Sequence, residues 1–111
     1  LINEGFPQFI VDHLLPKYDL AGMTIGLLGM AFKADIDDTR DSLSYKLKRL
    51  LQFQSKAVLT SDPFVNTDPN LTSLEQTLKQ SDLLILCVPH AAYKKIKTKK
   101  PVIDIWNFLP K

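Results

Sequence analysis

Short apolar runs recur along this chain and are separated by stretches in which apolar residues have helical spacing. The runs contain several branched side chains and few polar residues, as is typical of strands that are covered on both faces. We therefore predict four strands. They comprise the apolar run Ile25, Leu27 and Leu28 that follows Thr24, and residues 57–60, 83–88 and 102–105.

A helix is predicted over residues 3–18, before the first strand. Pro7 fits this helix if it lies in the first turn, where a proline is tolerated. Apolar and aromatic side chains recur at helical spacing and predict one stripe along the helix. That stripe comprises Phe6, Phe9, Ile10, His13 and Leu14.

Three further helices are predicted between and after the strands. Ser42 can cap a second helix, and the Ser73-x-x-Gln76 spacing matches a capping box that opens a short third one. A basic helix is predicted over residues 91–97. The core-facing stripe predicted for the second helix comprises Leu43, Leu47, Leu50 and Leu51.

This alternation of strands and helices predicts an α/β fold. It is a Rossmann-like parallel sheet with helices on both faces and the strand order 2-1-3-4, because crossover connections are right-handed. The order reverses between the first and third strands, and open α/β sheets bind ligands at such a point, beyond the carboxyl ends of the strands. Residues 29–33 and 89–90 emerge there.

Composition narrows the possible functions only slightly. The 111 residues are 45% apolar and 23% charged, which is ordinary for one soluble domain. A net charge of +2 does not by itself indicate nucleic-acid binding, and no apolar run is long enough to span a membrane. The single cysteine, Cys87, suits a reducing cytosol. We predict a cytoplasmic domain with no nucleic-acid or membrane partner, excised from a longer chain because the first residues include no Met.

Neither a metal centre nor a nucleophile is indicated. His13, Cys87 and His90 lack the spacing of metal ligands, and Cys87 lies in the most apolar run, where a thiolate is disfavoured. Two charged groups remain, and we interpret each as solvated rather than as a cation site or an anion site. They are the loop aspartates Asp35, Asp37 and Asp38, and the cluster Lys94, Lys95, Lys97, Lys99 and Lys100.

The stretch 24–33, TIGLLGMAFK, combines features that suit nucleotide binding. Gly26 and Gly29 allow a tight turn at the end of the first strand. Phe32 and Lys33 follow, so that a ring could cover a base or sugar while an ammonium group faces phosphate. The alternative is a core strand followed by a surface lysine.

The longer stretch GLLGMAFKADIDDTRDS resembles the C-terminal domain of the nucleotide-sugar dehydrogenases of the UDP-glucose/GDP-mannose type. Those domains carry a motif of the form G-x-x-G-x-A-F-K followed by x-x-D-D-x-R-x-S. Asp62-Pro63, Ser81-Asp82 and residues 102–104 also look like the family. The resemblance covers essentially the whole chain.

The resemblance implies an NAD-dependent UDP-sugar 6-dehydrogenase, which oxidises a sugar C6 alcohol to a uronate. In this chain, residues 1–20 would be the end of a central linking helix region and residues 21–111 the UDP-sugar-binding α/β domain. An N-terminal domain of the same chain would hold NAD, and the intact enzyme would be a homodimer.

By the same resemblance, Phe32 and Lys33 contact the sugar nucleotide, and Arg40 reaches towards NAD. The plainer alternative for Arg40 is a surface ion pair with Asp37 or Asp41. The family's thioester cysteine would lie upstream and Cys87 does not match it, so no catalytic residue and no metal ligand is expected within this chain.

One departure concerns the substrate. UDP-glucose enzymes usually carry an arginine in a D-G-R-N-like run near the last strand, and here Trp106 stands at that position, with Asn107 as a match for the substrate-binding asparagine. The run from Val88 to His90, followed by Tyr93, looks more like members that act on UDP-N-acetylhexosamines. Two other interpretations stay open: a stand-alone nucleotide- or anion-binding module, and a structural dimerisation domain.

Overall fold

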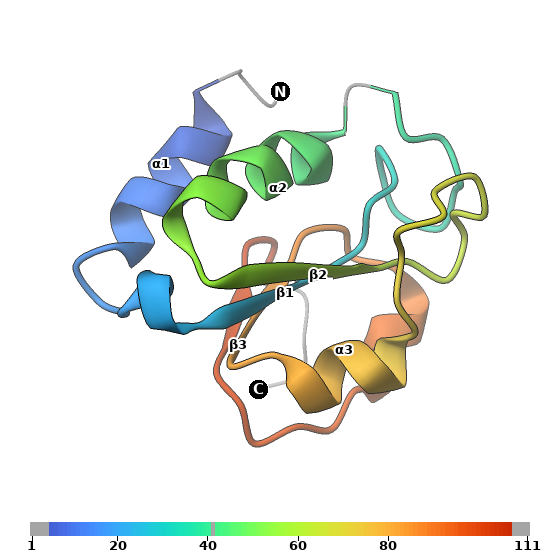
Figure 1. The fold of residues 1–111 in the computed structure, drawn as a ribbon. Helices are drawn as coiled ribbons and strands as arrows, with labels where there is room; N and C mark the ends of the chain where they lie inside the picture. The colour runs from blue at the N-terminus through green and yellow to red at the C-terminus, as the bar shows by residue number, and fades with distance from the viewer. Residues whose placement is uncertain (1–4, 41, 108–111) are drawn as a thin grey trace.

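A single parallel sheet organises the computed structural model, which describes residues 5–40 and 42–107 (Figure 1). Its strands are β1 (Thr24–Leu28), β2 (Ala57–Ser61), β3 (Leu83–Leu86) and β4 (Val102–Asp104), in the order β2-β1-β3-β4. The predicted fold class and strand order are therefore confirmed. Because β1 pairs with both β2 and β3, it lies inside the sheet, and the predicted reversal of strand order falls between β1 and β3.

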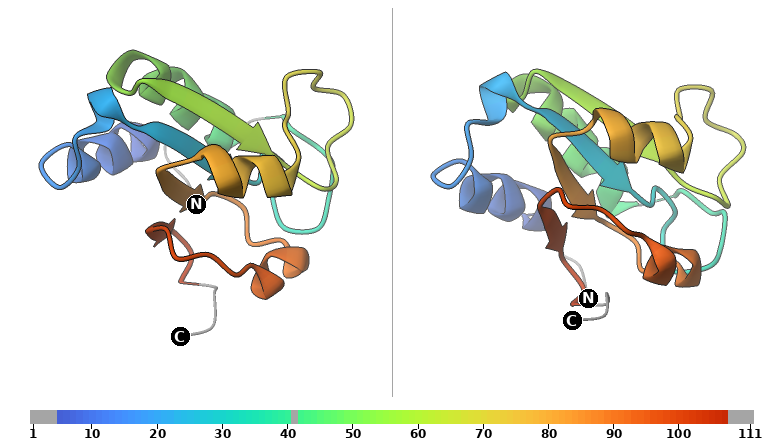
Figure 2. Two further views of the ribbon diagram at one scale, coloured as in Figure 1. Left: turned by 60° about the horizontal axis from the view of Figure 1, so that its bottom comes forward. Right: turned by 90° about the horizontal axis from the view of Figure 1, so that it is seen from below.

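Helices cover both faces of the sheet (Figure 2). Helices α1 (Phe6–Leu14) and α2 (Leu43–Gln54) lie on one face, and α3 (Leu74–Gln80) lies on the other together with the 3-10 helix η2 (Ala91–Lys95). A short 3-10 turn, η1 (Leu20–Gly22), leads into β1. None of the helices in the described part of the chain has the length and apolar character that a membrane span requires.

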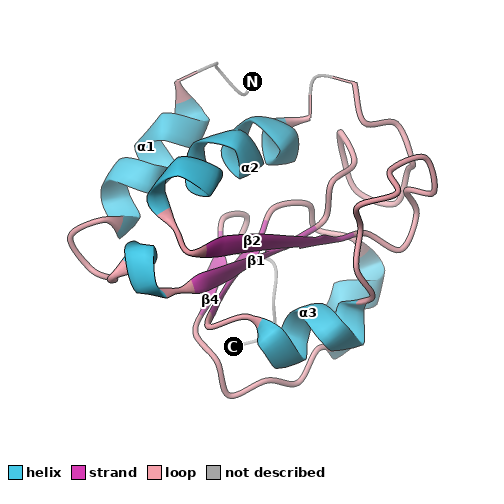
Figure 3. Ribbon diagram, in the orientation of Figure 1, coloured by secondary structure: helices cyan, strands magenta, loops and turns pink. Residues whose placement is uncertain are grey.

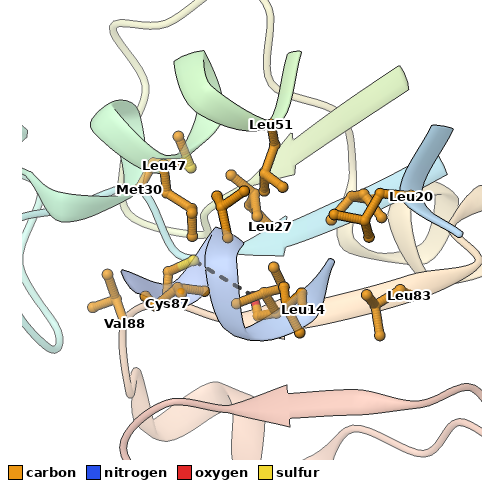
Figure 4. Close-up of a cluster of buried hydrophobic side chains, with 13 residues drawn as sticks. Leu14, Leu20, Leu27, Met30, Leu47, Leu51, Leu83, Cys87 and Val88 are labelled. Carbon is orange, nitrogen blue, oxygen red and sulfur yellow. Dashed lines mark hydrogen bonds between the residues drawn. The ribbon is translucent and has the colours of Figure 1, made fainter. Parts of the chain in front are cut away.

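Side chains of β1 and β3 point alternately to these two layers. Ile25 and Leu27 of β1 belong to the core under α1 and α2, whereas Leu28 belongs to the core under α3 and η2. Figure 4 shows the larger of these two cores, in which residues from both helices meet the sheet. Its labelled members are Leu14, Leu20, Leu27, Met30, Leu47, Leu51, Leu83, Cys87 and Val88.

Two of the predicted helix starts are confirmed by their caps. The backbone N–H of Ser44 donates to Ser42 Oγ (3.1 Å) at the start of α2, and that of Gln76 donates to Ser73 Oγ (3.1 Å) at the start of α3. Each bond satisfies a backbone donor that the first turn of a helix leaves unpaired.

The stripe predicted for the first helix is wrong in part. Phe9 is 62% exposed and His13 is exposed, whereas Val11, absent from the prediction, is fully buried beside Ile10. The ring of Phe9 stacks on those of its helix neighbours Phe6 and His13 and not into the core. Pro7 does lie in the first turn, as predicted.

Several predicted ends are also corrected. Helix α1 spans Phe6–Leu14 and not residues 3–18, of which 3 and 4 lie outside the described residues. The basic helix ends at Lys95 as a 3-10 helix, and β3 ends at Leu86, before Pro89. Cys87 and Val88 remain buried although they follow the strand, which is why the apolar run predicted a longer one.

Gly26 lets α3 approach the sheet closely. A Cβ added there would lie 2.3 Å from Ser81 Oγ and 2.9 Å from Thr77 Cγ2, closer than real Cβ contacts allow. The absence of a side chain in the middle of β1 therefore brings α3 against the strand that leads into the site described below.

Candidate functional site

The loops that follow β1 and β2 gather at one end of the sheet (Figure 3). The chain leaves β1 at Gly29, whose φ of +100° is unfavourable for residues with a side chain. A Cβ added to Gly29 would also lie 2.6 Å from Val88 Cβ, just after β3. The first loop therefore starts in close contact with the segment that follows the neighbouring strand, as predicted for the point where the strand order reverses.

Asp62, directly after β2, holds the beginning of this loop. Its Oδ2 accepts hydrogen bonds from the backbone N–H groups of Met30 (2.7 Å) and Ala31 (3.0 Å). Its Oδ1 accepts from those of Phe64 (2.7 Å) and Val65 (3.2 Å) in its own loop. One carboxylate thus fixes the two loops that leave β1 and β2.

His90, after β3, completes this cluster and is fully buried. Its Nδ1 accepts a hydrogen bond from the backbone N–H of Asp35 (2.7 Å), so that nitrogen carries no proton. The hydrogen-bond pattern therefore assigns the proton to Nε2, which donates to Asp62 Oδ2 (2.8 Å). The ring of Phe64 lies against the imidazole, with 4.8 Å between ring centroids.

Asp35 ties the far side of the same loop to the segment after β3. Its Oδ1 accepts from the backbone N–H of Ala91 (2.9 Å), while its own N–H donates to His90. Asp35 has a φ of +59°, a left-handed conformation that aspartate tolerates better than most residues. The loop is thus fastened before residue 32 by Asp62 and after residue 33 by His90 and Ala91.

Phe32 and Lys33 lie between these fastened points, and both are exposed, Phe32 by 51%. The backbone N–H of Phe32 donates to the carbonyl of Asp38, which draws the D-D-x-R segment alongside. The two residues that the sequence singled out therefore present a ring and an ammonium group to solvent from an ordered backbone.

Arg40 lies further along this loop and forms a bidentate ion pair with Asp38. Its Nη2 is 2.7 Å from Asp38 Oδ2 and its Nε is 3.1 Å from Asp38 Oδ1. The hydrogen bond from the Arg40 side chain, helped by one from its backbone N–H, lowers the pKa of Asp38 to about 2. The sequence had suggested Asp37 or Asp41 as partner, and the latter lies outside the described residues. The guanidinium group stays on the surface, because the Arg40 side chain is 87% exposed.

A hollow of about 320 Å³ adjoins the D-D-x-R segment, and no sequence pattern predicted it. Among the described residues, two with cationic side chains and three with hydroxyl groups line it. The lining residues are Thr39, Ser42, Tyr45, Lys46 and Arg49.

Asn107 lies apart from the loop of Phe32 and Lys33, because it follows β4 and β3 separates that strand from β1. Its neighbour Trp106 donates from Nε1 to the carbonyl of Cys87 (2.7 Å), which fixes the end of β4 to the end of β3. The indole is 43% exposed. The structure therefore places an aromatic surface at the position where the resemblance led us to look for an arginine.

Cys87 has the environment of an inert core residue. Burial raises the pKa of its thiol to about 12, so the nucleophilic thiolate is scarce at neutral pH. Among residues 5–40 and 42–107, no three or more His, Cys, Asp or Glu side chains come together in a way that could hold a metal ion.

The cluster of Asp62, His90 and Asp35 was not predicted from the sequence, although residues 89–90 were expected at the ligand-binding end of the sheet. The available signal was position: Asp62 directly follows β2 and His90 closely follows β3, so both lie at the same end of a parallel sheet. Nothing in the residue types predicted that one carboxylate would bind both backbone and imidazole.

Comparison with known proteins identifies the domain type. Residues 26–111 match the model of the UDP-glucose/GDP-mannose dehydrogenase family, UDP binding domain. A UDP-N-acetyl-D-mannosamine dehydrogenase of Pyrococcus horikoshii is 30% identical over 100 residues, which are 86% of this chain and 23% of that protein. A second one, from Yersinia pestis, is 32% identical over 87% of this chain and 27% of its own length.

Solved structures agree with these relatives. A UDP-glucose dehydrogenase from Pyrobaculum islandicum superposes with a TM-score of 0.78 at 27% identity, over 92% of this chain and 26% of that one. The chain thus spans about a quarter of the length of the relatives that it matches.

Proposed function

The chain belongs to the UDP-glucose/GDP-mannose dehydrogenase family, as its UDP-binding domain, and from this premise we propose that it binds the nucleotide of a UDP-sugar substrate. The oxidation would be NAD-dependent and would convert the C6 alcohol of the sugar to a carboxylate. An N-terminal domain of the same polypeptide would bind NAD, and the complete enzyme would be a cytoplasmic homodimer.

The observation that carries this proposal is the exposed Phe32–Lys33 pair at the carboxyl end of β1. Lysine is a compact cation suited to a diphosphate, and an exposed phenyl ring can cover the apolar parts of a nucleoside. Asn107 would contribute from the end of β4. Arg40, exposed beyond the loop, would reach NAD bound by the other domain.

We propose a UDP-N-acetylhexosamine as the sugar nucleotide, with UDP-glucose as the alternative. Several relatives are named for N-acetylated amino sugars, including those of Pyrococcus horikoshii and Yersinia pestis. Trp106 is consistent with this preference. It stands where UDP-glucose enzymes usually carry an arginine, so this chain lacks a cation that is typical of the UDP-glucose site.

Titration of UDP, followed by calorimetry, tests the proposal. We expect Lys33→Ala to weaken binding by about tenfold to a hundredfold, which is roughly 1.5–3 kcal/mol for a lost charged hydrogen bond. Lys56→Ala is a matched control, because Lys56 is also exposed but precedes β2, at the opposite end of the sheet. Where the 111-residue chain binds too weakly to measure, the same pair of variants is compared in the complete enzyme.

Equal affinities of wild type and Lys33→Ala would remove Lys33 from the site. If neither the 111-residue chain nor the complete enzyme binds UDP, the interpretation as a structural dimerisation domain is favoured. If the complete polypeptide binds UDP but contains no NAD-binding domain, the stand-alone nucleotide module is favoured.

A further inference from the structure

We propose that His90 is the positioning residue for the Phe32–Lys33 arc, by which we mean residues 30–35. In this role, which rests on the proposed function, His90 acts on the nucleotide only through the backbone that it holds. Its imidazole links the two anchors of the arc. One anchor is Asp62, which binds the backbone just before Phe32, and the other is Asp35, just after Lys33.

The first anchor, Asp62, restricts which hydrogen-bonding group the residue at position 90 can direct towards it. Asp62 Oδ2 already accepts hydrogen bonds from the backbone N–H groups of Met30 and Ala31, and its Oδ1 accepts two more. An ionised carboxylate can only accept hydrogen bonds. The group that faces Asp62 from the segment after β3 must therefore be a donor, as His90 Nε2–H is.

The second anchor requires the opposite chemistry from the same side chain. The backbone N–H of Asp35 points at His90 Nδ1 from 2.7 Å and needs an acceptor there. A neutral imidazole provides a donor and an acceptor on two different edges of one rigid ring. Asn and Gln carry both functions on a single short amide group, so neither can reach Asp62 and Asp35 together in the way that His90 does.

The conformation of Asp35 makes this link important for the arc. A non-glycine residue at φ +59° holds a sparsely populated conformation that persists only where surrounding bonds enforce it. Two bonds do so here, from its N–H to His90 and from Ala91 N–H to its carboxylate. Loss of the first bond lets the arc relax, so that nucleotide binding must then order it again.

Two variants of His90 break one anchor each. His90→Gln keeps a donor near the position of Nε2 for Asp62 and loses the acceptor for Asp35. His90→Asn keeps an acceptor near the position of Nδ1 for Asp35 and loses the donor for Asp62. Tyr93→Phe is the control, since Tyr93 borders His90 in the core but its hydroxyl donates to the Ser61 carbonyl, outside the arc.

The readouts are amide hydrogen exchange, measured by NMR, and the Kd for UDP. In His90→Gln we expect exchange at the Asp35 amide to accelerate at least tenfold while that at Ala31 changes little, and in His90→Asn the reverse. Both variants should weaken UDP binding about threefold to tenfold. Tyr93→Phe should lower the melting temperature yet keep the wild-type exchange rates in the arc and the Kd within twofold.

Wild-type exchange and affinity in folded His90→Gln and His90→Asn would overturn the inference. So would equal loosening of the arc by Tyr93→Phe, because His90 would then be a general core residue. If the wild type fails to bind UDP, the proposed function is what fails, and the exchange pattern still decides the positioning role.

If both His90 variants fail to fold, variants of the exposed Asp35 test whether the second anchor of the arc affects nucleotide binding. Asp35→Asn keeps the acceptor for Ala91 and tolerates the left-handed backbone, whereas Asp35→Ala does neither. We expect weaker UDP binding, again threefold to tenfold, only in Asp35→Ala. Identical affinities of the two variants would overturn the inference.

Discussion

At the scale of single residues, Asp62 connects the loops that follow β1 and β2 and accepts a hydrogen bond from His90. Burial by itself raises the pKa of this carboxyl, but the hydrogen bonds from His90, Met30 and Phe64 outweigh burial and lower it from the ordinary value of 3.8. The ionised form is therefore the one that the fold stabilises. Asp62 thus couples the geometry of the arc to the ionisation of a single group.

The stability of the domain should depend on this ionisation in acid. Because the pKa of Asp62 is lower in the folded than in the unfolded protein, its contribution is complete above 3.8 and is lost as the pH falls through the lower, folded value. Asp62→Ala should lower the free energy of unfolding near neutral pH by about 2–4 kcal/mol, because buried backbone donors lose their acceptor. Urea unfolding at about pH 3 and at about pH 7 measures both effects.

The control for that measurement is Asp37→Ala, since Asp37 is exposed on the loop after β1, whose backbone Asp62 binds. The difference in free energy of unfolding between wild type and each variant, taken at both pH values, gives the contribution of one carboxyl among the several that titrate in acid. If the stability of Asp62→Ala falls between neutral pH and acid as steeply as that of wild type, another carboxyl must be responsible for the acid loss.

Arg40 should affect the cofactor and not the sugar nucleotide. Its guanidinium group pairs with Asp38 on the surface, so Arg40→Ala should change the melting temperature little. In the complete enzyme, we expect this variant to raise the KM for NAD while the Kd for UDP stays within about twofold of wild type. Arg40→Lys keeps the positive charge but loses the bidentate geometry, so its KM for NAD should lie between those of wild type and Arg40→Ala. The opposite split, with UDP affected and NAD unaffected, would assign the loop to the other ligand.

At the scale of elements, the junction between β1 and its loop determines where the site begins. Gly29 makes a left-handed turn there against Val88, and no room exists for a side chain. Gly29→Ala should lower the free energy of unfolding by about 2–4 kcal/mol, since left-handed strain and overpacking add. Thermal unfolding measures this loss.

Gly22→Ala provides the matched control for Gly29→Ala. Among the described residues, a Cβ at Gly22 would meet only the exposed Asp19 side chain, 3.1 Å from its Oδ2, and that carboxylate can move away. We expect a change below about 1 kcal/mol at this position. Similar losses in the two variants would mean that the close approach of Gly29 to Val88 is not what matters.

The sequence predicted the elements well where local signals were strong. Continuous apolar runs indicated the buried strands, and the serines at 42 and 73 marked two helix starts that the structure confirms. The buried face of α1 was partly mispredicted, because Phe9 stacks with its helix neighbours on the surface and Val11 enters the core. The cluster around Asp62 could not be predicted, because it depends on how three loops meet in space and not on any local pattern.

At the scale of the whole molecule, the chain corresponds to about a quarter of the relatives that it matches. Its sequence contains one cysteine, Cys87, and the structure buries it. We therefore expect no NADH production when the 111-residue chain is mixed with NAD and any UDP-sugar, because hydride transfer needs both ligands held in register. NADH absorbance, with a complete family enzyme as positive control, checks this. Steady turnover by the purified chain would contradict the division of labour that we propose.

The hydrogen bonds of the arc also join residues that are far apart along the chain. Met30 is 32 residues from Asp62, Asp62 is 28 from His90, and Asp35 is 55 from His90. Each of these contacts requires a long loop to close, which costs conformational entropy. During synthesis from the N-terminus, Phe32 and Lys33 leave the ribosome long before His90 does. The Phe32–Lys33 arc is thus made early but cannot take its final shape before His90 has been synthesised.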